Sequence, residues 1–394
     1  MDLSFYRGKK ILITGHTGFK GSWMSQLLLR EGAEVYGYAK QPPTDPSMYG
    51  LCGLKTEMES IEGDVRDLDT LRSVFLRVKP EFVVHMAAQP IVRESYRNPV
   101  ETYETNVMGT VNVLECIRQT DSVNSFLNVT TDKVYKNREW EWGYRENEEL
   151  NGYDPYSNSK SCSELVTDSY RNSFFGNSGL RVLPITTARA GNVIGGGDFA
   201  ADRIIPDCVR AVSSGEKIRV RNPYSVRPYQ HVLEPVAAYL MILKRQWEQP
   251  ELAGCYNVGP DEADCWETGR ITTEFCKAWK NHTGKEVDWI DLGKEENIKQ
   301  PHEANFLKLD CTRLKRTFDW TPSWTAKMAV ERTVEWYAEY VQGKNVRDCT
   351  ERQIEAFLRE KLYLLLPACS AIINKMFVVR GNTRVCVRTD NIRR

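Results

Sequence analysis

The sequence predicts an α/β fold in which a doubly wound parallel sheet carries a smaller, interleaved α/β substrate-binding domain. Short apolar runs rich in Ile, Leu and Val alternate with segments whose apolar residues recur at helical spacing. A glycine triplet stands directly after the first run, and beyond Arg189 the steady alternation gives way to glycine-dense segments separated by Pro and Trp. The first half is therefore expected to be Rossmann-like, with helices on both faces of a parallel sheet.

The expected elements follow one another along the chain in this alternation. The first strand covers residues 9–14 and ends in glycines, and the first helix covers residues 23–30. Further strands are expected over residues 34–38, 81–87, 125–130 and 181–188, with a third strand-like segment before Asp64. Helices are expected over residues 68–78, 100–118 and 155–175.

The boundary between the two domains is expected to be crossed more than once. A helix over residues 232–246 and a strand over residues 255–258 are expected to return to the first domain. We therefore assign residues 1–188 and about 232–260 to the Rossmann-like domain, and residues 189–231 and about 261–345 to the smaller one. A closing helix is expected over residues 325–341, and residues 358–394 form a C-terminal extension of unassigned structure.

Composition narrows the functional class. The 394 residues are 41% hydrophobic and 27% charged, with 53 basic and 53 acidic residues, so no global field attracts nucleic acid or membrane. Eleven scattered cysteines without a CxxC pair, and a start without an apolar signal core, indicate a reduced cytoplasm. The five histidines are isolated, so no metal site is expected. The longest apolar stretch near the C-terminus is broken by Pro367, so no membrane span is expected.

The glycine triplet predicts a dinucleotide site. Gly15, Gly18 and Gly21 follow a strand and open a helix, where they permit a tight turn and close approach to a pyrophosphate at the helix N-terminus. His16 and Lys20 lie inside this loop and are candidates for ribose or phosphate contacts.

Residues after the next strands complete the predicted cofactor site. Asp64 and Val65 are placed to reach an adenine, and Ala87 and Ala88 provide an apolar wall beside a nicotinamide. A helix cap is the structural alternative for Asp64. The acid that normally bonds the ribose 2′-hydroxyl of NAD is missing after the second strand, where Lys40 stands instead, so this loop leaves NAD and NADP open.

Tyr156 and Lys160 are candidates for proton transfer coupled to hydride transfer. They lie four residues apart in a helical segment and therefore share a face. A tyrosine base at neutral pH needs its pKa lowered by roughly three units, for which Lys160 and an oxidised nicotinamide are the expected sources. An exposed Tyr–Lys pair is the alternative, but a strand ending in Thr130 and Thr131 precedes the motif.

Asp132 and Lys133 directly after that strand indicate a second reaction, elimination. Once a 4-ketone has formed on a sugar, loss of the C5 proton and protonation of the C6 hydroxyl expel water, which needs one base and one acid. Lys133 as the base must be neutral. A turn cap and a solvated lysine are the alternative interpretation.

These residues resemble the extended short-chain dehydrogenase/reductase family, and within it the nucleotide-sugar 4,6-dehydratases. The motifs that carry the resemblance, which spans about residues 9–357, are TGHTGFKG (14–21), HMAAQP (85–90), NVMGT (106–110), TTDKVY (130–135), YxxxK (156–160), RAGNVIGGGD (189–198) and RPYQHV (227–232). In that family dTDP-glucose dehydratases have Asp-Glu at positions 132 and 133, GDP-mannose dehydratases have Ser-Glu, and 4-epimerases lack the acid/base pair. The resemblance therefore implies CDP-glucose as substrate and NAD as cofactor.

The resemblance also implies roles for further residues. Asn106 supports the catalytic tyrosine, Thr131 bonds the reacting oxygen, and Phe19 and Gln89 join the cofactor contacts. The residues implied in nucleotide-sugar binding are Arg93, Asn192, Arg203, Asn222 and Arg227.

The implied setting is deoxysugar synthesis for bacterial surface polysaccharide, by a homodimer or homotetramer paired through residues 100–118 and 155–175. Another nucleotide-sugar dehydratase, a 4-epimerase and a non-catalytic NAD-binding partner protein stay open as alternatives.

Overall fold

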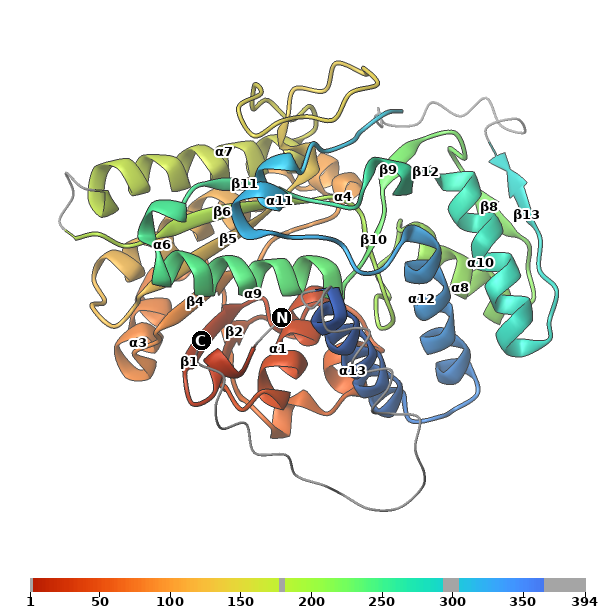
Figure 1. Ribbon diagram of the computed structural model, residues 1–394, viewed down its shortest axis with the longest axis horizontal. Helices are drawn as coiled ribbons and strands as arrows, with labels where there is room; N and C mark the ends of the chain where they lie inside the picture. The colour runs from red at the N-terminus through yellow and green to blue at the C-terminus, as the bar shows by residue number, and fades with distance from the viewer. Residues whose placement is uncertain (1–2, 177–180, 293–304, 365–394) are drawn as a thin grey trace, which may run out of the picture.

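A parallel sheet flanked by helices forms the larger part of the molecule (Figure 1). The computed structural model describes residues 3–176, 181–292 and 305–364. Within them, seven strands pair in the order β3-β2-β1-β4-β5-β6-β11, all parallel. These strands are β1 Lys10–Thr14, β2 Glu34–Ala39, β3 Glu59–Glu62, β4 Phe82–His85, β5 Ser125–Thr131, β6 Ile185–Ala190 and β11 Cys255–Val258. The predicted doubly wound fold is confirmed.

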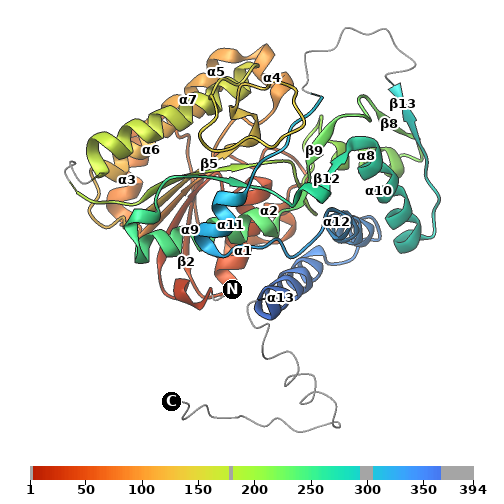
Figure 2. The same cartoon turned by 45° about the horizontal axis from the view of Figure 1, so that its top comes forward.

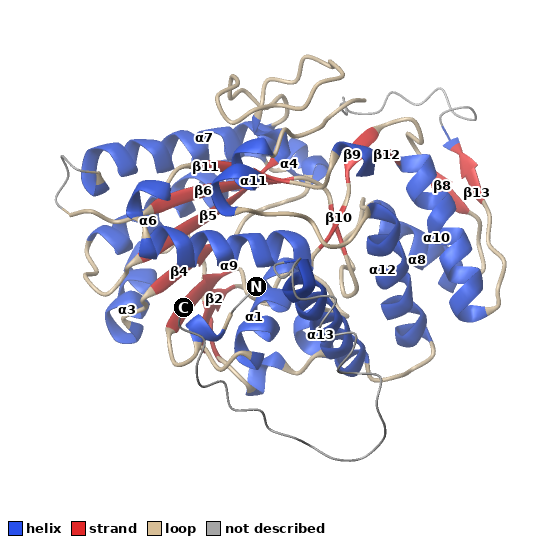
Figure 3. Cartoon of the chain, in the orientation of Figure 1, coloured by secondary structure: helices blue, strands red, loops and turns tan. Residues whose placement is uncertain are grey.

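Helices cover both faces of this sheet (Figure 3). The helices are α1 Phe19–Arg30, α2 Met48–Leu51, α3 Leu68–Val78, α4 Val92–Arg97, α5 Pro99–Tyr103, α6 Gly109–Arg118, α7 Pro155–Tyr170, α8 Ile204–Ser213, α9 Leu233–Glu248, α10 Thr268–Thr283, α11 Thr312–Phe318, α12 Ala326–Val341 and α13 Val346–Leu364. One core joins α3 and α6 to one face, and a second core joins α1 and α9 to the other. The direction of winding reverses between β1 and β4, so a crevice opens at the carboxyl ends of these strands.

A smaller group of elements lies beside the sheet (Figure 2). It contains α8, α10 and α12 with three short strand pairs, β7 Val193–Ile194 with β10 Gln230–His231, β8 Ile218–Val220 with β13 Trp289–Asp291, and β9 Val226–Pro228 with β12 Cys265–Glu267. The chain returns from this group to the sheet, because α9 packs on β5 and β11 pairs with β6. The exact domain bounds stay a prediction.

Several element bounds differ from those predicted. The helix expected at residue 23 begins at Phe19, because Gly18 caps it. The strand expected from residue 181 begins at Ile185, because Pro184 has no N–H to give to a ladder. The single helices expected over residues 100–118 and 155–175 each contain a π-helical turn, Glu104–Met108 and Arg171–Phe175.

The C-terminal extension begins later than predicted. The helix α13 continues past Phe357 to Leu364 and is docked, because Lys361 is buried and forms a 3.3 Å ion pair with buried Glu234 of α9. The rest of the predicted extension, residues 365–394, lies outside the described residues.

Candidate active site

A cavity of about 350 Å³ lies where the carboxyl ends of β5 and β6 meet the smaller group of elements. Eleven of the residues predicted from the sequence line it. They are Phe19, Lys20, Arg93, Thr131, Asp132, Lys133, Tyr156, Asn192, Arg203, Asn222 and Arg227. Residues from α1, β5, α7 and the smaller group therefore surround one space.

The glycine loop has the shape that a dinucleotide phosphate requires. Gly15 has a φ of +79°, and a Cβ on it would lie 2.7 Å from the backbone nitrogen of Ala87. A Cβ on Gly21 would lie 2.3 Å from the carbonyl oxygen of Gly15. Gly18 occupies the N-cap of α1, whose first N–H groups face the loop. These residues fit the predicted cofactor contact at a helix N-terminus.

His16 faces the second and third strands. Its Nε2 lies 2.7 Å from Ser60 Oγ, and its ring packs against Gly37, where any Cβ would collide with it. Burial lowers the pKa of His16 to about 4, so the imidazole is neutral. Within the described residues its Nδ1 has no hydrogen-bond partner, but this atom is buried against Gly37, so the predicted ribose or phosphate contact of His16 stays a prediction.

Asp64 and Lys40 form one rim of the predicted cofactor site. Asp64 does not cap a helix, because Asp67 caps α3. Instead it forms a 2.7 Å ion pair with Arg66 and lies 4.0 Å from the ammonium of Lys40. Val65 next to it is buried and packs against Gly109.

Asn106 positions the loop that follows β4. Its side chain accepts a hydrogen bond from Gln89 N (2.8 Å) and donates to Gln89 O (3.1 Å) and to Ser159 Oγ (2.8 Å). Ser159 in turn donates to the carbonyl oxygen of Tyr156 at 2.7 Å. Asn106 therefore ties the loop of Ala87, Ala88 and Gln89 to the backbone of α7, from a π-helical turn of the kind often found at functional sites.

Tyr156 lies in the cavity wall with Lys160 one turn further along α7. Burial raises the pKa of Tyr156 to about 12, against the lowering effect of a hydrogen bond with Thr131. Lys160 is buried and donates to the carbonyl oxygen of Val129 at 3.2 Å. Burial, with the charge of Lys20, lowers the pKa of Lys160 to about 8. The lowered tyrosine pKa that we predicted is not produced by the protein groups alone.

Asp132 is a buried carboxyl group whose surroundings disfavour its charged form. It is 1% exposed, it accepts a 3.0 Å hydrogen bond from Thr131, and its Oδ2 has no hydrogen-bond partner among the described residues. Burial raises the pKa of Asp132, although the charge of Lys133 lowers it. Lys133 is half-buried and lines the same cavity.

On the opposite wall, the sequence analysis indicated Arg93 and Arg203 but assigned no role to Asp198, Asp202 or Arg221. Asp198 forms a 2.8 Å ion pair with Arg203, and Asp202 lies 2.7 Å from Arg221 and 3.6 Å from Arg93. A cavity wall this rich in guanidinium groups suits a diphosphate. The three Asp and five Arg over residues 198–227 were the available signal.

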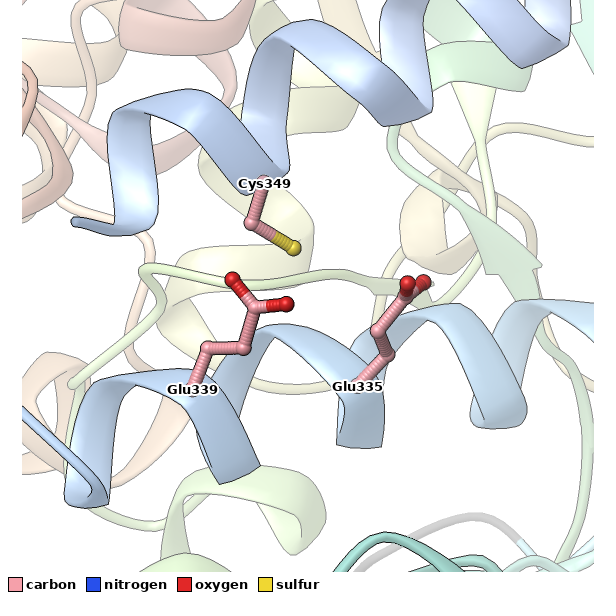
Figure 4. A group of neighbouring side chains, drawn as sticks. All are labelled: Glu335, Glu339 and Cys349. Atoms are coloured by element: carbon pink, nitrogen blue, oxygen red, sulfur yellow. The ribbon is translucent and has the colours of Figure 1, made fainter. Parts of the chain in front are cut away.

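Outside the cavity, one group of side chains in the described residues has the spacing of metal ligands (Figure 4). Glu335 and Glu339 on α12 gather with Cys349 on α13. Each carboxylate pairs with an arginine, Arg332 at 3.2 Å and Arg352 at 2.6 Å, and burial raises the pKa of Cys349 to about 12. The Glu339–Arg352 pair joins α12 to α13, whereas the Glu335–Arg332 pair lies within α12. A metal would need the thiolate of Cys349, which the raised pKa disfavours, so this group fits a helix contact better than a metal site.

Comparison with known proteins assigns the family. The family model described as GDP-mannose 4,6 dehydratase matches residues 12–333. The chain belongs to this family. The matched residues include most of the sheet and the cavity-forming segments of this chain, up to the middle of α12.

Individual relatives fall within the same group of enzymes. The CDP-glucose 4,6-dehydratase of Salmonella typhimurium is 44% identical over 361 residues, which cover 91% of this chain and 98% of that protein. The dTDP-D-glucose 4,6-dehydratase of Dictyostelium discoideum is 27% identical over 64% of this chain and 58% of that protein.

Solved structures share the fold. The dTDP-glucose 4,6-dehydratase of Bacillus anthracis, solved in complex with NAD, is 20% identical with a TM-score of 0.68, covering 86% of this chain and 100% of that chain. The UDP-glucose 4-epimerase of Thermotoga maritima, solved with UDP-glucose, is 21% identical with a TM-score of 0.69, covering 84% and 99%. Among the described residues, the helices of this dehydratase-family chain are too short or too polar to cross a bilayer.

Proposed function

We propose that the chain converts CDP-D-glucose to CDP-4-dehydro-6-deoxy-D-glucose and water, with NAD retained through the cycle. Asp132 carries the proposal, because a buried acid with a raised pKa stands beside Thr131 and Tyr156 in one cavity. An epimerase has no need of such an acid, since it expels no water. The 44% identity to a CDP-glucose 4,6-dehydratase, over nearly the full length of both chains, supports the choice of nucleotide.

The glycine loop, Phe19, Lys20 and the rim of Asp64, Val65 and residues 87–89 would hold the NAD. When bound, NAD supplies the hydride acceptor for C4 and the hydride donor for C6. Lys40 lies 4.0 Å from Asp64 and 3.7 Å from Glu101, so two carboxylates offset the charge of the lysine that would favour a 2′-phosphate, which supports NAD rather than NADP.

The protein groups divide the proton transfers between two steps. Tyr156 accepts the C4 hydroxyl proton while Thr131 bonds the oxygen, and Lys160 contributes positive charge near the phenolate. Lys133 then removes the C5 proton, and Asp132 donates a proton to the departing C6 hydroxyl. Arg93, Arg203 and Arg227 hold the diphosphate, and Asn192 and Asn222 complete the wall.

The decisive experiment is turnover by the full chain with CDP-glucose and catalytic NAD. We expect a 4-keto product that absorbs in alkali, and Tyr156→Phe is the matched inactive control. A panel of CDP-, UDP-, dTDP- and GDP-sugars checks the nucleotide. A C4 epimer as product would make the chain an epimerase, and absence of any product would favour a non-catalytic NAD-binding protein.

The base of the elimination can be tested separately. Lys133→Ala is expected to keep oxidation at C4, seen as trapped NADH, and to lose water elimination. Solvent deuterium at C5 of the wild-type product would report the abstraction step. Full turnover by Lys133→Ala would remove this lysine from the mechanism.

We further propose that the enzyme works in the cytoplasm as a homodimer or homotetramer, early in deoxysugar synthesis for surface polysaccharide. An exposed apolar face on α5, the adjoining π-helical turn and α7 supports the pairing: Val100 is 69% exposed, Met108 50% and Leu165 57%. The double variant Val100→Lys/Met108→Lys is expected to lower the mass measured by light scattering by one half. An unchanged mass would place the interface elsewhere.

A further inference from the structure

The segment that joins β7 to α8 lines the cavity and packs against aromatic residues of α1 and α12. Trp23 Nε1 donates to the carbonyl oxygen of Gly196 at 2.9 Å, and a Cβ on Gly196 would lie 2.0 Å from the ring of Trp336. The ring of Phe199 packs edge to face with Trp336 and Tyr337, at centroid distances of 6.2 and 5.8 Å. Residues far apart in the sequence therefore fix this part of the cavity wall.

Tyr337 on α12 is connected to the cavity through Asp198. Its side chain is fully buried, and its hydroxyl donates a hydrogen bond to the backbone carbonyl oxygen of Asp198. The carboxylate of Asp198 accepts from Ala200 N at 3.2 Å and from Arg203 Nη1 at 2.8 Å. Arg203 lines the cavity, whereas Tyr337 is not among the described residues that line it. Two successive contacts thus connect a hydroxyl on α12 to a guanidinium in the cavity.

The backbone at Asp198 needs a contact of this kind. It follows a run of three glycines that ends in Gly197, whose φ of +83° favours glycine. Glycines lose more conformational freedom on folding than other residues, so the run does not by itself fix the direction of the next side chain. The Tyr337 hydroxyl binds directly after the run, and it therefore restricts the position from which the Asp198 carboxylate extends.

The helix that carries Tyr337 is itself held in place. Trp336 Nε1 donates to Thr350 Oγ1 of α13 at 2.9 Å, and both side chains are fully buried. The same helix packs along α10. A group on a rigid element holds its partner more precisely than a group on a loop does.

We propose that Tyr337 is a positioning residue for the diphosphate of the nucleotide sugar, acting through Asp198 and Arg203. The proposal rests on the proposed function, in which Arg203 binds the diphosphate. A guanidinium has several N–H donors in a planar fork, so one bond to Asp198 orients the fork and leaves donors for phosphate oxygens. Without the Tyr337 hydroxyl, a buried carbonyl oxygen loses its partner, and Asp198 and Arg203 can move away from the phosphate.

The first test compares the kinetics of Tyr337→Phe and Tyr6→Phe in the full chain. Tyr6 is the matched control, because it is also fully buried and donates to a backbone carbonyl oxygen, that of Leu240, at 2.5 Å, but does not line the cavity. We expect Tyr337→Phe to raise the KM for CDP-glucose about tenfold and to change kcat less than about twofold, because ground state and transition state lose the same contact. Tyr6→Phe should change either constant less than about twofold. Melting curves show that both variants are folded.

A double-mutant cycle with Arg203→Met tests the route of the effect. The probe is CDP, titrated by calorimetry into NAD-saturated protein, so that binding is measured without turnover. We expect Tyr337→Phe to weaken CDP binding about tenfold in the wild-type background. In the Arg203→Met background the same change should weaken binding less than about twofold, because the group that Tyr337 positions is gone.

Asp198→Asn tests the middle contact and is the second variant should Tyr337→Phe not fold. It keeps the backbone carbonyl oxygen that accepts from Tyr337, and it weakens the charge-assisted bond to Arg203. We expect it to raise the KM for CDP-glucose about tenfold as well.

Four results would overturn the proposal. They are an unchanged KM and CDP affinity in folded Tyr337→Phe, an equal rise of KM in Tyr6→Phe, an unchanged KM in Asp198→Asn, and full weakening of CDP binding by Tyr337→Phe in the Arg203→Met background. A wild type that binds CDP without turning over CDP-glucose would refute the proposed dehydration, and the binding cycle would still decide the role of Tyr337. A wild type that binds no CDP would refute both.

Discussion

Two groups of charged residues, carried by α1, α7, β6 and the segment after β5, are built differently. In the first, Glu164 and Arg189 are each 3% exposed and form a 2.9 Å ion pair. Thr187 donates to the same carboxylate at 2.6 Å, and Arg189 donates to Tyr135 Oη at 2.8 Å. In the second, the cavity group, Asp132 keeps one oxygen without a partner and Lys20 has no ion pair among the described residues.

Burial acts on the pKa values of both groups, but a close counter-ion opposes it strongly only in the first. Burial alone would lower the pKa of Arg189, but Glu164 raises it above its ordinary value. In the cavity group burial prevails, so the pKa of Asp132 is raised and those of Lys20 and Lys160 fall to about 8. The close ion pair of Glu164 and Arg189 fixes their charges and stabilises the structure, although Arg189 Nε has no hydrogen-bond partner among the described residues. In the cavity group no such close ion pair holds Asp132 or Lys160, and their protons can move more readily.

The largest effect should come from the acid of the cavity group. Asp132→Asn is expected to lower kcat about 10²–10⁴-fold, because the amide cannot protonate the leaving hydroxyl. Its unfolding free energy should change by less than about 1 kcal/mol, because the carboxylate makes a single hydrogen bond, from Thr131. Turnover and urea denaturation measure the two effects. Asp168→Asn on the exposed side of α7 is the control. A large loss of stability in Asp132→Asn would mean that the cavity group stabilises the fold as the ion pair of Glu164 and Arg189 does.

The paired group should show the reverse. Glu164→Met is expected to lower the unfolding free energy by about 3–5 kcal/mol, because Arg189 is left buried without its counter-ion. The double variant Glu164→Met/Arg189→Met should recover part of that loss, and Asp168→Asn, which breaks the exposed pair with Arg171, should cost about 0–1 kcal/mol. Denaturant titration compares all three. A single variant no less stable than the double one would contradict the assignment.

The fold was predictable because its signals are local. Apolar runs, the glycine triplet and helical periodicity predicted the strands of the sheet and the helices α3 and α7 to within a few residues. The errors came from neighbours that local patterns do not contain. One example is Lys361, which docks the end of α13 through Glu234, 127 positions earlier in the chain.

The sequence indicated those cavity residues that belong to recognisable motifs. It did not indicate roles that depend on contacts between distant parts of the chain. Tyr156, Asp132 and Lys133 fall in the cavity as the motifs indicated. Lys20 was assigned to the cofactor because it stands in the glycine loop, and the sequence did not indicate that it lines the same cavity as Asp132. The sequence did not indicate the ion pairs of Asp202 either, because Arg93 lies on α4 and Arg221 in the smaller group of elements.

The smallest expected effect is a pH dependence of the unfolding free energy that arises from Lys20. An unfolded lysine has a pKa near 10.4, whereas Lys20 in the folded chain has a pKa of about 8. Between these values the unfolded state binds more protons, so this group makes stability rise with pH from about 8 to about 10.4. Below pH 8 the lysine is charged in both states, and its burial costs a constant amount.

Lys20→Met removes that cost. The variant is expected to be about 1–3 kcal/mol more stable than the wild type at pH 7, and the difference should shrink as the pH rises through 8–10.4. Urea denaturation of both proteins across this range measures it, with Lys277→Met, an exposed lysine paired with Glu274, as the control. A difference that stayed constant with pH would mean that the folded chain does not lower the pKa of Lys20. The contrast between the cavity group and the ion pair of Glu164 and Arg189 would then fail.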